Sequence, residues 1–196
     1  PVVVFLHGWG KLGSDYYRIG SELASMGIVA VMMNTARHSY SLMEDDAKAL
    51  FGAINAATST EGTFFQGSMD ISKVGLMGHS MGGAVLALVL NESSSAPSKN
   101  PGYKCALGFA PVNPSLAVTN TVVTVPIGLV SGLGDTLTPP YLHATPYYSS
   151  LVPADGLKFH YKLDTVATHM NLVGLGPVNP VIFERSLKIM NGFFGQ

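Results

Sequence analysis

Residues 73–90 read KVGLMGHSMGGAVLALVL, and this stretch decides the fold. Small and β-branched apolar residues lead into Gly-His-Ser-Met-Gly-Gly, after which an apolar run resumes. Residues 78–82 match the pattern G-x-S-x-G, which places a serine on a sharp turn between a strand and a helix. Glycines stand two positions before and two after the serine, where side chains would collide with the packing around such a turn. We therefore predict a strand over Val74–Met77, a helix over Met81–Leu90 and an exposed hydroxyl at Ser80.

The same alternation of short apolar runs and amphipathic segments continues along the whole chain. The other expected strands are Val2–Leu6, Ile28–Met33, Ala106–Phe109, Ile127–Val130 and Phe159–Leu163. The other expected helices are Tyr16–Met26, Glu44–Thr58, Pro140–Leu151 and Pro180–Asn191. We expect Ser14 or Asp15 to cap the first of these, and the second carries acidic residues in its first turn. Apolar strands that alternate with helices predict an α/β fold, with a mostly parallel sheet of about six strands covered on both faces.

The composition excludes several classes of function. Of the 196 residues only 12% are charged and the net charge is −1, without a basic stripe, so we expect no nucleic-acid partner. No apolar run reaches the roughly 18 residues that a membrane span needs. The six histidines show no HExxH-like spacing, so we expect neither a metal nor a cofactor.

The length fits a single domain over residues 1–196. The chain opens at Pro1 directly on an apparent core strand, which fits either a leader removed by processing or a piece of a longer protein. The scarcity of lysine and the abundance of Ser, Thr and Asn favour secretion. The composition leaves the oligomeric state open.

Ser80 needs a general base and an acid that orients the base, because a serine hydroxyl alone is a poor nucleophile. In parallel sheets ligands bind at the carboxyl ends of the strands, and the expected chain order for this turn is Ser, acid, His. Asp135 follows the strand at Ile127–Val130, and His169 follows the last strand. We predict a triad of Ser80, His169 and Asp135. Asp164 is the alternative acid, although it stands only five residues before His169.

An oxyanion that forms during acyl transfer needs two N–H donors. The backbone N–H of Met81, directly after the serine, is one candidate. The loop LHGWGKLGSD after the first strand supplies the other, because its glycines allow the chain to turn over the site. The N–H of Trp9 is our candidate there.

The remaining histidines and the single cysteine have structural interpretations. We expect the His79 side chain to point away from the serine hydroxyl. His38, His143 and His160 are interpreted as surface or hydrogen-bonded residues. Cys105 is interpreted as a small buried thiol and not as a nucleophile.

These residues resemble the α/β-hydrolase family over essentially the whole chain, through HGWG at 7–10, GHSMGG at 78–83, Asp135 and His169. Within it the chain is most similar to the bacterial cutinases and polyethylene-terephthalate (PET) hydrolases. The segments ELASMGIVAVMMNT and GDTLTPPYLHATPYYSSL also resemble that branch. The resemblance implies a cleft lined by Trp9, Met81, Leu137 and Met170, with no substantial lid.

The chain also departs from that branch. The segment FAPVNPSLAVTN lacks the tryptophan that these enzymes carry there, one cysteine excludes their C-terminal disulfide, and two initial strands are missing. The turn that carries Ser80 and the loop that carries Asp135 also resemble those of chlorophyllases and of dienelactone-hydrolase relatives.

The function we predict is a serine carboxylic ester hydrolase that acts through an acyl-enzyme on apolar or polymeric esters. Three alternatives stay open. The first is an esterase of a small metabolite. The second is hydrolysis of amide, thioester or carbon–carbon bonds. The third is a non-catalytic ligand-binding protein on the same fold.

Overall fold

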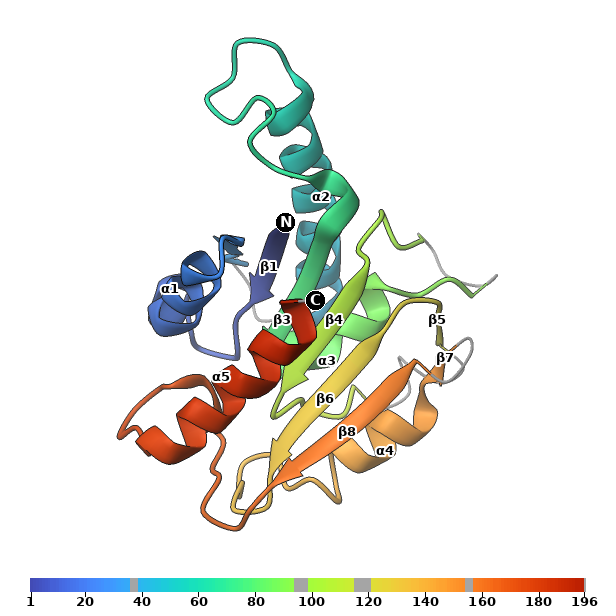
Figure 1. Cartoon of the computed structure of the whole chain (residues 1–196). Coiled ribbons are helices and arrows are strands. Elements are labelled where there is room, and N and C mark those ends of the chain that lie inside the picture. The colour runs from blue at the N-terminus through green and yellow to red at the C-terminus, as the bar shows by residue number, and fades with distance from the viewer. Residues whose placement is uncertain (36–38, 94–98, 115–120, 154–156, 196) are drawn as a thin grey trace.

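A central sheet of six parallel strands organises the chain, and the strands follow the order β2-β1-β3-β4-β6-β8 (Figure 1). The computed structural model describes residues 1–35, 39–93, 99–114, 121–153 and 157–195. The strands are β1 (Val2–Leu6), β2 (Val29–Met32), β3 (Val74–His79), β4 (Cys105–Phe109), β6 (Ile127–Gly132) and β8 (Lys158–Leu163). Every pairing within this sheet is parallel, which confirms the predicted α/β class.

Helices cover both faces of the sheet, α1 and α5 on one face and α2, α3 and α4 on the other (Figure 1). The helices are α1 (Tyr17–Ser25), α2 (Tyr40–Ser59), α3 (Met81–Val89), α4 (Ala144–Ser150) and α5 (Pro180–Phe194). Alternate side chains of β1 serve the two layers, since Val2 and Val4 pack toward α2 and α3, whereas Val3 and Phe5 pack toward α1 and α5. The central strands β1, β3 and β6 are therefore buried on both faces, as their continuous apolar runs predicted, whereas the edge strands β2 and β8 are partly exposed.

Several local predictions are wrong at their edges. The segment Gly13–Tyr16 is a short 3₁₀ helix, so Ser14 and Asp15 both lie inside it and neither caps α1. Helix α2 begins at Tyr40, four residues earlier than expected, so Glu44 lies beyond its first turn and pairs with Lys48. Helix α4 is shorter than predicted, because the chain from Pro140 to His143 forms turns.

A second, two-stranded parallel sheet joins β5 (Val122–Val123) and β7 (Val152–Pro153). Strands of two residues carry no periodic signal, and the sequence analysis misses them. Helix α5, by contrast, begins where it was predicted, with Pro180 in its first turn and the Asn179 side chain accepting hydrogen bonds from the first backbone amides.

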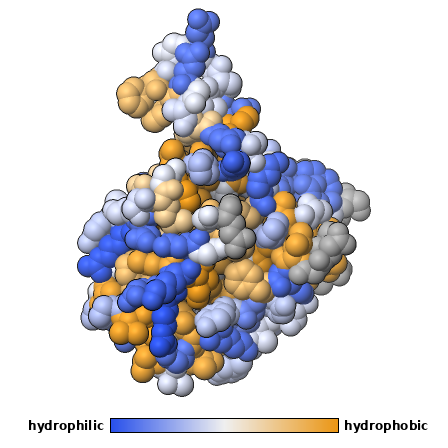
Figure 2. Space-filling view, in the orientation of Figure 1, coloured by the Kyte–Doolittle hydropathy of each residue, from blue (hydrophilic) through white to orange (hydrophobic). Residues whose placement is uncertain are grey.

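The surface mixes apolar and polar residues. Figure 2 shows both kinds interspersed over the face that carries α1 and α5. The C-terminal end of α2 and the loop after it project from the body (Figure 1), and Phe64 in that loop is 94% exposed. Within the described ranges, no helix combines the length and the apolar character that crossing a membrane requires.

Candidate active site

Ser80 occupies a strained turn between β3 and α3. Its φ of +56° lies in the left-handed region that residues other than glycine rarely adopt. Its N–H donates to the carbonyl of Phe109 at 2.9 Å, and its own carbonyl accepts from the N–H groups of Ala84 in α3 at 3.0 Å and of Val112 at 3.1 Å. These bonds hold the bend at the carboxyl edge of the sheet, as the G-x-S-x-G pattern predicted. The expected exposure of Ser80 is wrong, because the residue is only 8% exposed.

The glycines flanking the turn are required by close backbone contacts. A Cβ at Gly78 would lie 2.4 Å from the carbonyl oxygen of Gly82. A Cβ at Gly82 would lie 2.2 Å from the carbonyl oxygen of Leu6 in β1. The turn therefore lets α3 approach both its own strand and the neighbouring strand.

Gly82→Ala is expected to destabilise the protein by at least about 2–3 kcal/mol, because neither the Leu6 carbonyl nor the start of α3 can yield without disturbing the sheet. Urea unfolding monitored by circular dichroism measures the change. Gly52→Ala is the matched control: Gly52 lies in α2, is exposed, and has open space where the Cβ would go. That control should be neutral or more stable by up to about 1 kcal/mol, and equal stability of the two variants would contradict the close approach.

Asp135 and His169 form a buried pair on the loops that follow β6 and β8. Asp135 Oδ2 accepts from His169 Nδ1 at 2.8 Å, and the two side chains are 0% and 7% exposed. Asp135 Oδ1 accepts the backbone N–H groups of Leu137 and Thr138, at 2.9 and 2.8 Å. The carboxylate is thus fixed by its own loop and holds the imidazole with Nδ1 protonated, so that Nε2 can act as a base.

Thr138 is a member of this site that the sequence analysis missed. Its hydroxyl donates to Asp135 Oδ2 at 2.7 Å and lies 3.0 Å from His169 Nδ1. It also lies 3.2 Å from the carbonyl oxygen of Ala110. A hydroxyl three residues after an aspartate in the acid loop is the signal that points to it.

The charged form of Asp135 is stabilised in the folded protein. Burial alone would raise the pKa of this carboxyl group, but the hydrogen bonds from His169 and Thr138 outweigh burial and lower the pKa below its ordinary value.

A lowered pKa means that the folded state favours the ionised Asp135, so the associated stability is complete above the ordinary aspartate pKa of about 4. It is lost as the pH falls through the lowered pKa of the folded state. We expect the difference in unfolding free energy between the wild-type protein and Asp135→Asn to be constant from pH 7 to 5 and to shrink below pH 4. Urea titrations at each pH measure it, and a difference that grows on acidification would contradict the assignment.

Asp164, the alternative acid, is engaged elsewhere. Its carboxylate pairs with Arg185 Nη1 at 2.6 Å, and both side chains are about half exposed. It also accepts the N–H of Val166. Of the two candidate acids, only Asp135 contacts His169.

His79 brings the Ser80 turn and the His169 loop together. Its Nε2 donates to the carbonyl oxygen of His169 at 3.1 Å, and the two imidazole rings are 4.6 Å apart at their centroids. Because His79 directly precedes Ser80, this hydrogen bond ties the turn that carries the serine to the His169 loop. In the described residues the structure shows no hydrogen bond between these two side chains; such contacts tighten when a substrate binds.

A small cavity of about 150 Å³ lies over the serine and is lined by Trp9, Tyr40, Ser80, Met81 and Val112. Three of these residues are predicted site residues. As the first residue of α3, Met81 has an N–H group with no acceptor inside the helix, which makes it available to an oxyanion. Tyr40 and Val112 carry no motif in the sequence, and only the folded structure brings them here.

Leu137 and Met170 do not line that cavity and lie on the loops beside it. The Leu137 side chain is 63% exposed, two residues after Asp135, and Met170 is half-buried and directly follows His169. A role for them in binding substrate stays a prediction.

The other histidines are hydrogen-bonded, as interpreted. His143 Nδ1 accepts the N–H of Asn113 at 3.1 Å, and burial lowers the pKa of His143. His160 Nε2 lies 2.7 Å from the hydroxyl of buried Ser131, and burial, followed by the charge of Lys162, lowers its pKa to about 4. His38 lies outside the described residues.

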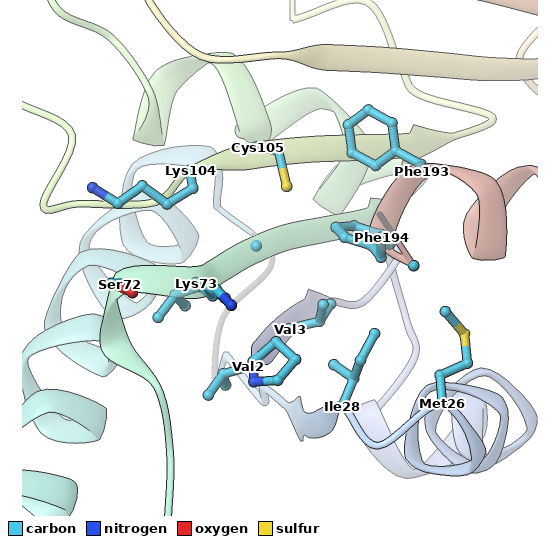
Figure 3. A pocket seen from close by; sticks show the side chains of 14 residues that line it. Val2, Val3, Met26, Ile28, Ser72, Lys73, Lys104, Cys105, Phe193 and Phe194 are labelled. Carbon is cyan, nitrogen blue, oxygen red and sulfur yellow. The ribbon is translucent and has the colours of Figure 1, made fainter.

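A larger cavity of about 520 Å³ opens at the opposite edge of the sheet, at the amino ends of β1, β3 and β4 (Figure 3). Lys73 and Lys104 line one side of it, and Phe193 and Phe194 of α5 line the other (Figure 3). Cys105 faces it, but burial raises the pKa of this thiol to about 11, so the thiol stays protonated and is a weak nucleophile. The proposed triad lies at the other edge of the sheet.

The part of the chain that the structure describes has no cluster of side chains suited to hold a metal ion. No group of three or more His, Cys, Asp or Glu side chains is placed there to hold an ion. The candidate site consists of the serine turn, the Asp135–His169 pair and the loop that carries Trp9.

Comparison with known proteins places this arrangement in a family. The family model described as PETase, PET hydrolase-like, matches residues 1–172. The chain belongs to the PET hydrolase-like family. The family has the α/β-hydrolase fold, in agreement with the six-stranded sheet and its two helical layers.

Curated relatives of this chain carry names of ester hydrolases. Cutinase 1 of Thermobifida cellulosilytica is 32% identical over 77% of this chain and 53% of its own length. A cutinase of Thermobifida fusca is also 32% identical, over 77% of this chain and 46% of its own length. A bis(hydroxyethyl) terephthalate hydrolase of Streptomyces coelicolor is 29% identical over 86% of this chain and 50% of its own length. The chain thus spans about half the length of the curated relatives it matches.

Proposed function

We propose that this protein is a serine carboxylic ester hydrolase that acts on apolar or polymeric esters through an acyl-enzyme. The observation that carries the proposal is that Ser80, held at φ +56°, and a buried Asp135–His169 pair both follow strands at the carboxyl edge of one sheet. Membership of the PET hydrolase-like family supports it, as do relatives named cutinase and bis(hydroxyethyl) terephthalate hydrolase.

The reaction would proceed in two steps. Ser80 Oγ attacks the ester carbonyl carbon while His169 Nε2 takes its proton, and the N–H groups of Trp9 and Met81 stabilise the oxyanion. His169 then gives the proton to the leaving alcohol, and an acyl-Ser80 ester remains. Water attacks this ester with His169 again as the base, which releases the acid and restores the serine. Asp135 keeps Nδ1 protonated throughout.

Exposed apolar side chains around the carboxyl edge favour a large apolar substrate. The loops after β1, β6 and β8 carry seven apolar side chains that are each more than half exposed: Trp9, Leu12, Leu133, Leu137, Tyr141, Leu142 and Val166. Exposed apolar groups on the loops at one edge of the sheet favour a binding surface for an apolar partner. A solid polyester or another apolar ester presents the complementary surface.

A panel of soluble substrates tests the reaction class. The wild-type protein should hydrolyse a chromogenic short-chain ester faster, by kcat/KM, than the matched thioester and anilide, and Ser80→Ala should be inactive on all three. Preference for the anilide would replace the ester assignment with an amidase. Equal rates for the wild-type protein and Ser80→Ala would favour the non-catalytic ligand-binding alternative.

A comparison of soluble and polymeric substrates tests the substrate class. Leu137→Ser and Tyr141→Ser should each reduce release of products from a polyester film about tenfold and change kcat/KM for the soluble ester less than about twofold. Phe64→Ser is the control, since Phe64 is an exposed aromatic residue on the projecting loop after α2. If film hydrolysis is as fast in these variants as in the control, a small-metabolite ester becomes the better substrate class.

We further propose that residues 1–196 form one domain and that the protein is secreted. Both hydrophobic clusters share the one six-stranded sheet, which supports a single folding unit. The low charge of the chain and the relatives named cutinase support secretion, because cutin is an extracellular polymer. Detection of the protein in culture medium tests the location.

A further inference from the structure

A continuous chain of buried hydrogen bonds links the segment after β1, the turn that carries Ser80 and the loop after β8. The N–H of Gly8 donates to the Tyr16 hydroxyl oxygen at 2.9 Å. The Tyr16 hydroxyl lies 2.9 Å from His79 Nδ1, and His79 Nε2 lies 3.1 Å from the carbonyl oxygen of His169. Tyr16 is 0% exposed and His79 is 1% exposed, so these polar groups have exchanged water for one another.

The groups at the two ends of this hydrogen-bond chain determine which atom donates in each bond. The Gly8 N–H can only donate and the His169 carbonyl can only accept. His79 therefore carries its proton on Nε2, and Nδ1 accepts the proton of the Tyr16 hydroxyl. Burial, together with the nearby His169 ring, lowers the pKa of His79 to about 3, so the imidazole stays neutral at the pH where an esterase works.

The loop that this chain holds includes the proposed oxyanion donor. Gly8 and Trp9 share one peptide group, in which the Gly8 carbonyl and the Trp9 N–H point in opposite directions, because the peptide is trans. The Gly8 carbonyl accepts from His7 Nδ1 at 2.8 Å and from the Lys11 N–H at 3.2 Å. The N–H and the carbonyl of Gly8 are thus both hydrogen-bonded. Because the Gly8 carbonyl and the Trp9 N–H belong to one peptide group, these bonds also set the direction of the Trp9 N–H.

The space around Gly8 is equally restricted. A Cβ at this position would lie 3.1 Å from both His79 Nδ1 and the Tyr16 hydroxyl and 3.2 Å from the Cβ of Ser80. The loop that carries Gly8 and Trp9 therefore packs directly on the turn that carries Ser80. A shift of the Tyr16 side chain would move the loop relative to the nucleophile.

We propose that Tyr16 and His79 are positioning residues that hold the Trp9 oxyanion donor and the His169 loop in register with Ser80. This inference rests on the proposed function for its kinetic consequence, although the hydrogen-bond chain itself does not. An oxyanion donor stabilises a transition state only when its N–H is already aimed at the developing charge. Loosening the loop should therefore reduce kcat and leave ground-state binding nearly unchanged.

Tyr16→Phe is the direct test, because it removes one hydroxyl and preserves the packing of the ring. We expect kcat per active site, titrated by a phosphonate that labels Ser80, to fall about 10- to 100-fold with KM within about twofold of wild type. Affinity for a boronic acid that mimics the tetrahedral intermediate should fall by a similar factor. Hydrogen exchange at the Gly8 amide, followed by NMR, should accelerate.

Tyr103→Phe is the matched control. Tyr103 is also 0% exposed, and its hydroxyl donates to the backbone carbonyl of Ala47 at 2.7 Å, within the layer of α2. It should lower the melting temperature, as Tyr16→Phe does, yet keep kcat and the Gly8 exchange rate at their wild-type values. A loss of kcat in Tyr16→Phe no larger than in Tyr103→Phe would overturn the proposal.

Substitutions at His79 give a second comparison if Tyr16→Phe fails to fold. His79→Gln retains one acceptor and one donor and should keep more of kcat than His79→Leu, which retains neither. Equal kcat values for these two variants would overturn the proposal. If the wild-type protein hydrolyses no ester, the proposed function fails, and the Gly8 exchange rates alone then support or overturn the positioning role.

Discussion

Ser80→Ala is expected to lower kcat for a chromogenic ester by about 10⁵- to 10⁶-fold, and His169→Ala by a similar factor. Without the hydroxyl no acyl-enzyme can form, and without the imidazole the hydroxyl keeps its proton. Because the two residues act as one unit, the double variant should lose little more than either single variant. Initial rates at saturating ester, corrected for spontaneous hydrolysis, measure the loss.

The chain provides its own control in a second serine–histidine pair. Ser131 lies 2.7 Å from His160, on β6 and β8, but the serine is 0% exposed. Ser131→Ala and His160→Ala should therefore keep kcat within about threefold of wild type. Residual activity above about one percent in Ser80→Ala, or a loss in Ser131→Ala equal to that in Ser80→Ala, would remove Ser80 from its proposed role.

Asp135→Asn is expected to reduce kcat by about 10⁴-fold while the protein still folds. An asparagine amide in this place can donate to His169 Nδ1, which would leave the proton on Nε2, where it blocks abstraction of the serine proton. The Thr138 hydroxyl, 3.0 Å from the same nitrogen, can accept from Nδ1 and preserve part of the productive tautomer. Steady-state kinetics and the near-ultraviolet circular dichroism spectrum measure activity and fold separately.

Asp164→Asn is the comparison that decides between the two acids. The exposed Asp164–Arg185 pair contributes at most about 1 kcal/mol to stability, so the variant should fold and keep kcat within about twofold of wild type. If Asp164→Asn lost the activity and Asp135→Asn kept it, the acid role would pass to Asp164.

Local sequence patterns predicted most of the secondary structure, because each strand or helix core is marked within a few neighbouring residues. The strand at Val2–Leu6 has the predicted bounds, and α5 begins at Pro180 as expected. The errors lie where the local signal is weak. The 3₁₀ turn Gly13–Tyr16 is selected by tertiary packing, since its Gly13 N–H donates to the Asn34 side chain across the sheet edge.

The candidate site likewise has one part that local sequence predicted and another that depends on tertiary packing. Spacing within one segment identified the Ser80 turn, because the glycines and the serine lie within five residues. The order of acid and histidine along the chain suggested Asp135 and His169 but could not exclude Asp164. Their contact joins residues 34 apart, and only the packing of β6 beside β8 produces it. The catalytic roles of all three triad residues stay predictions that the variants above test.

By itself, the sequence determined the parallel α/β fold and the strand-to-helix turn at Ser80, because those features depend on periodicity and on glycine at fixed spacings. Only the tertiary structure decided which acid faces His169, which side chains line the cavity over the serine, and that Tyr16 and His79 link Gly8 to the His169 loop. Tyr16 and His79 are 63 residues apart, and His79 and His169 are 90 apart. Contacts at such separations arise when the sheet and its helices pack together, and no short-range pattern encodes them.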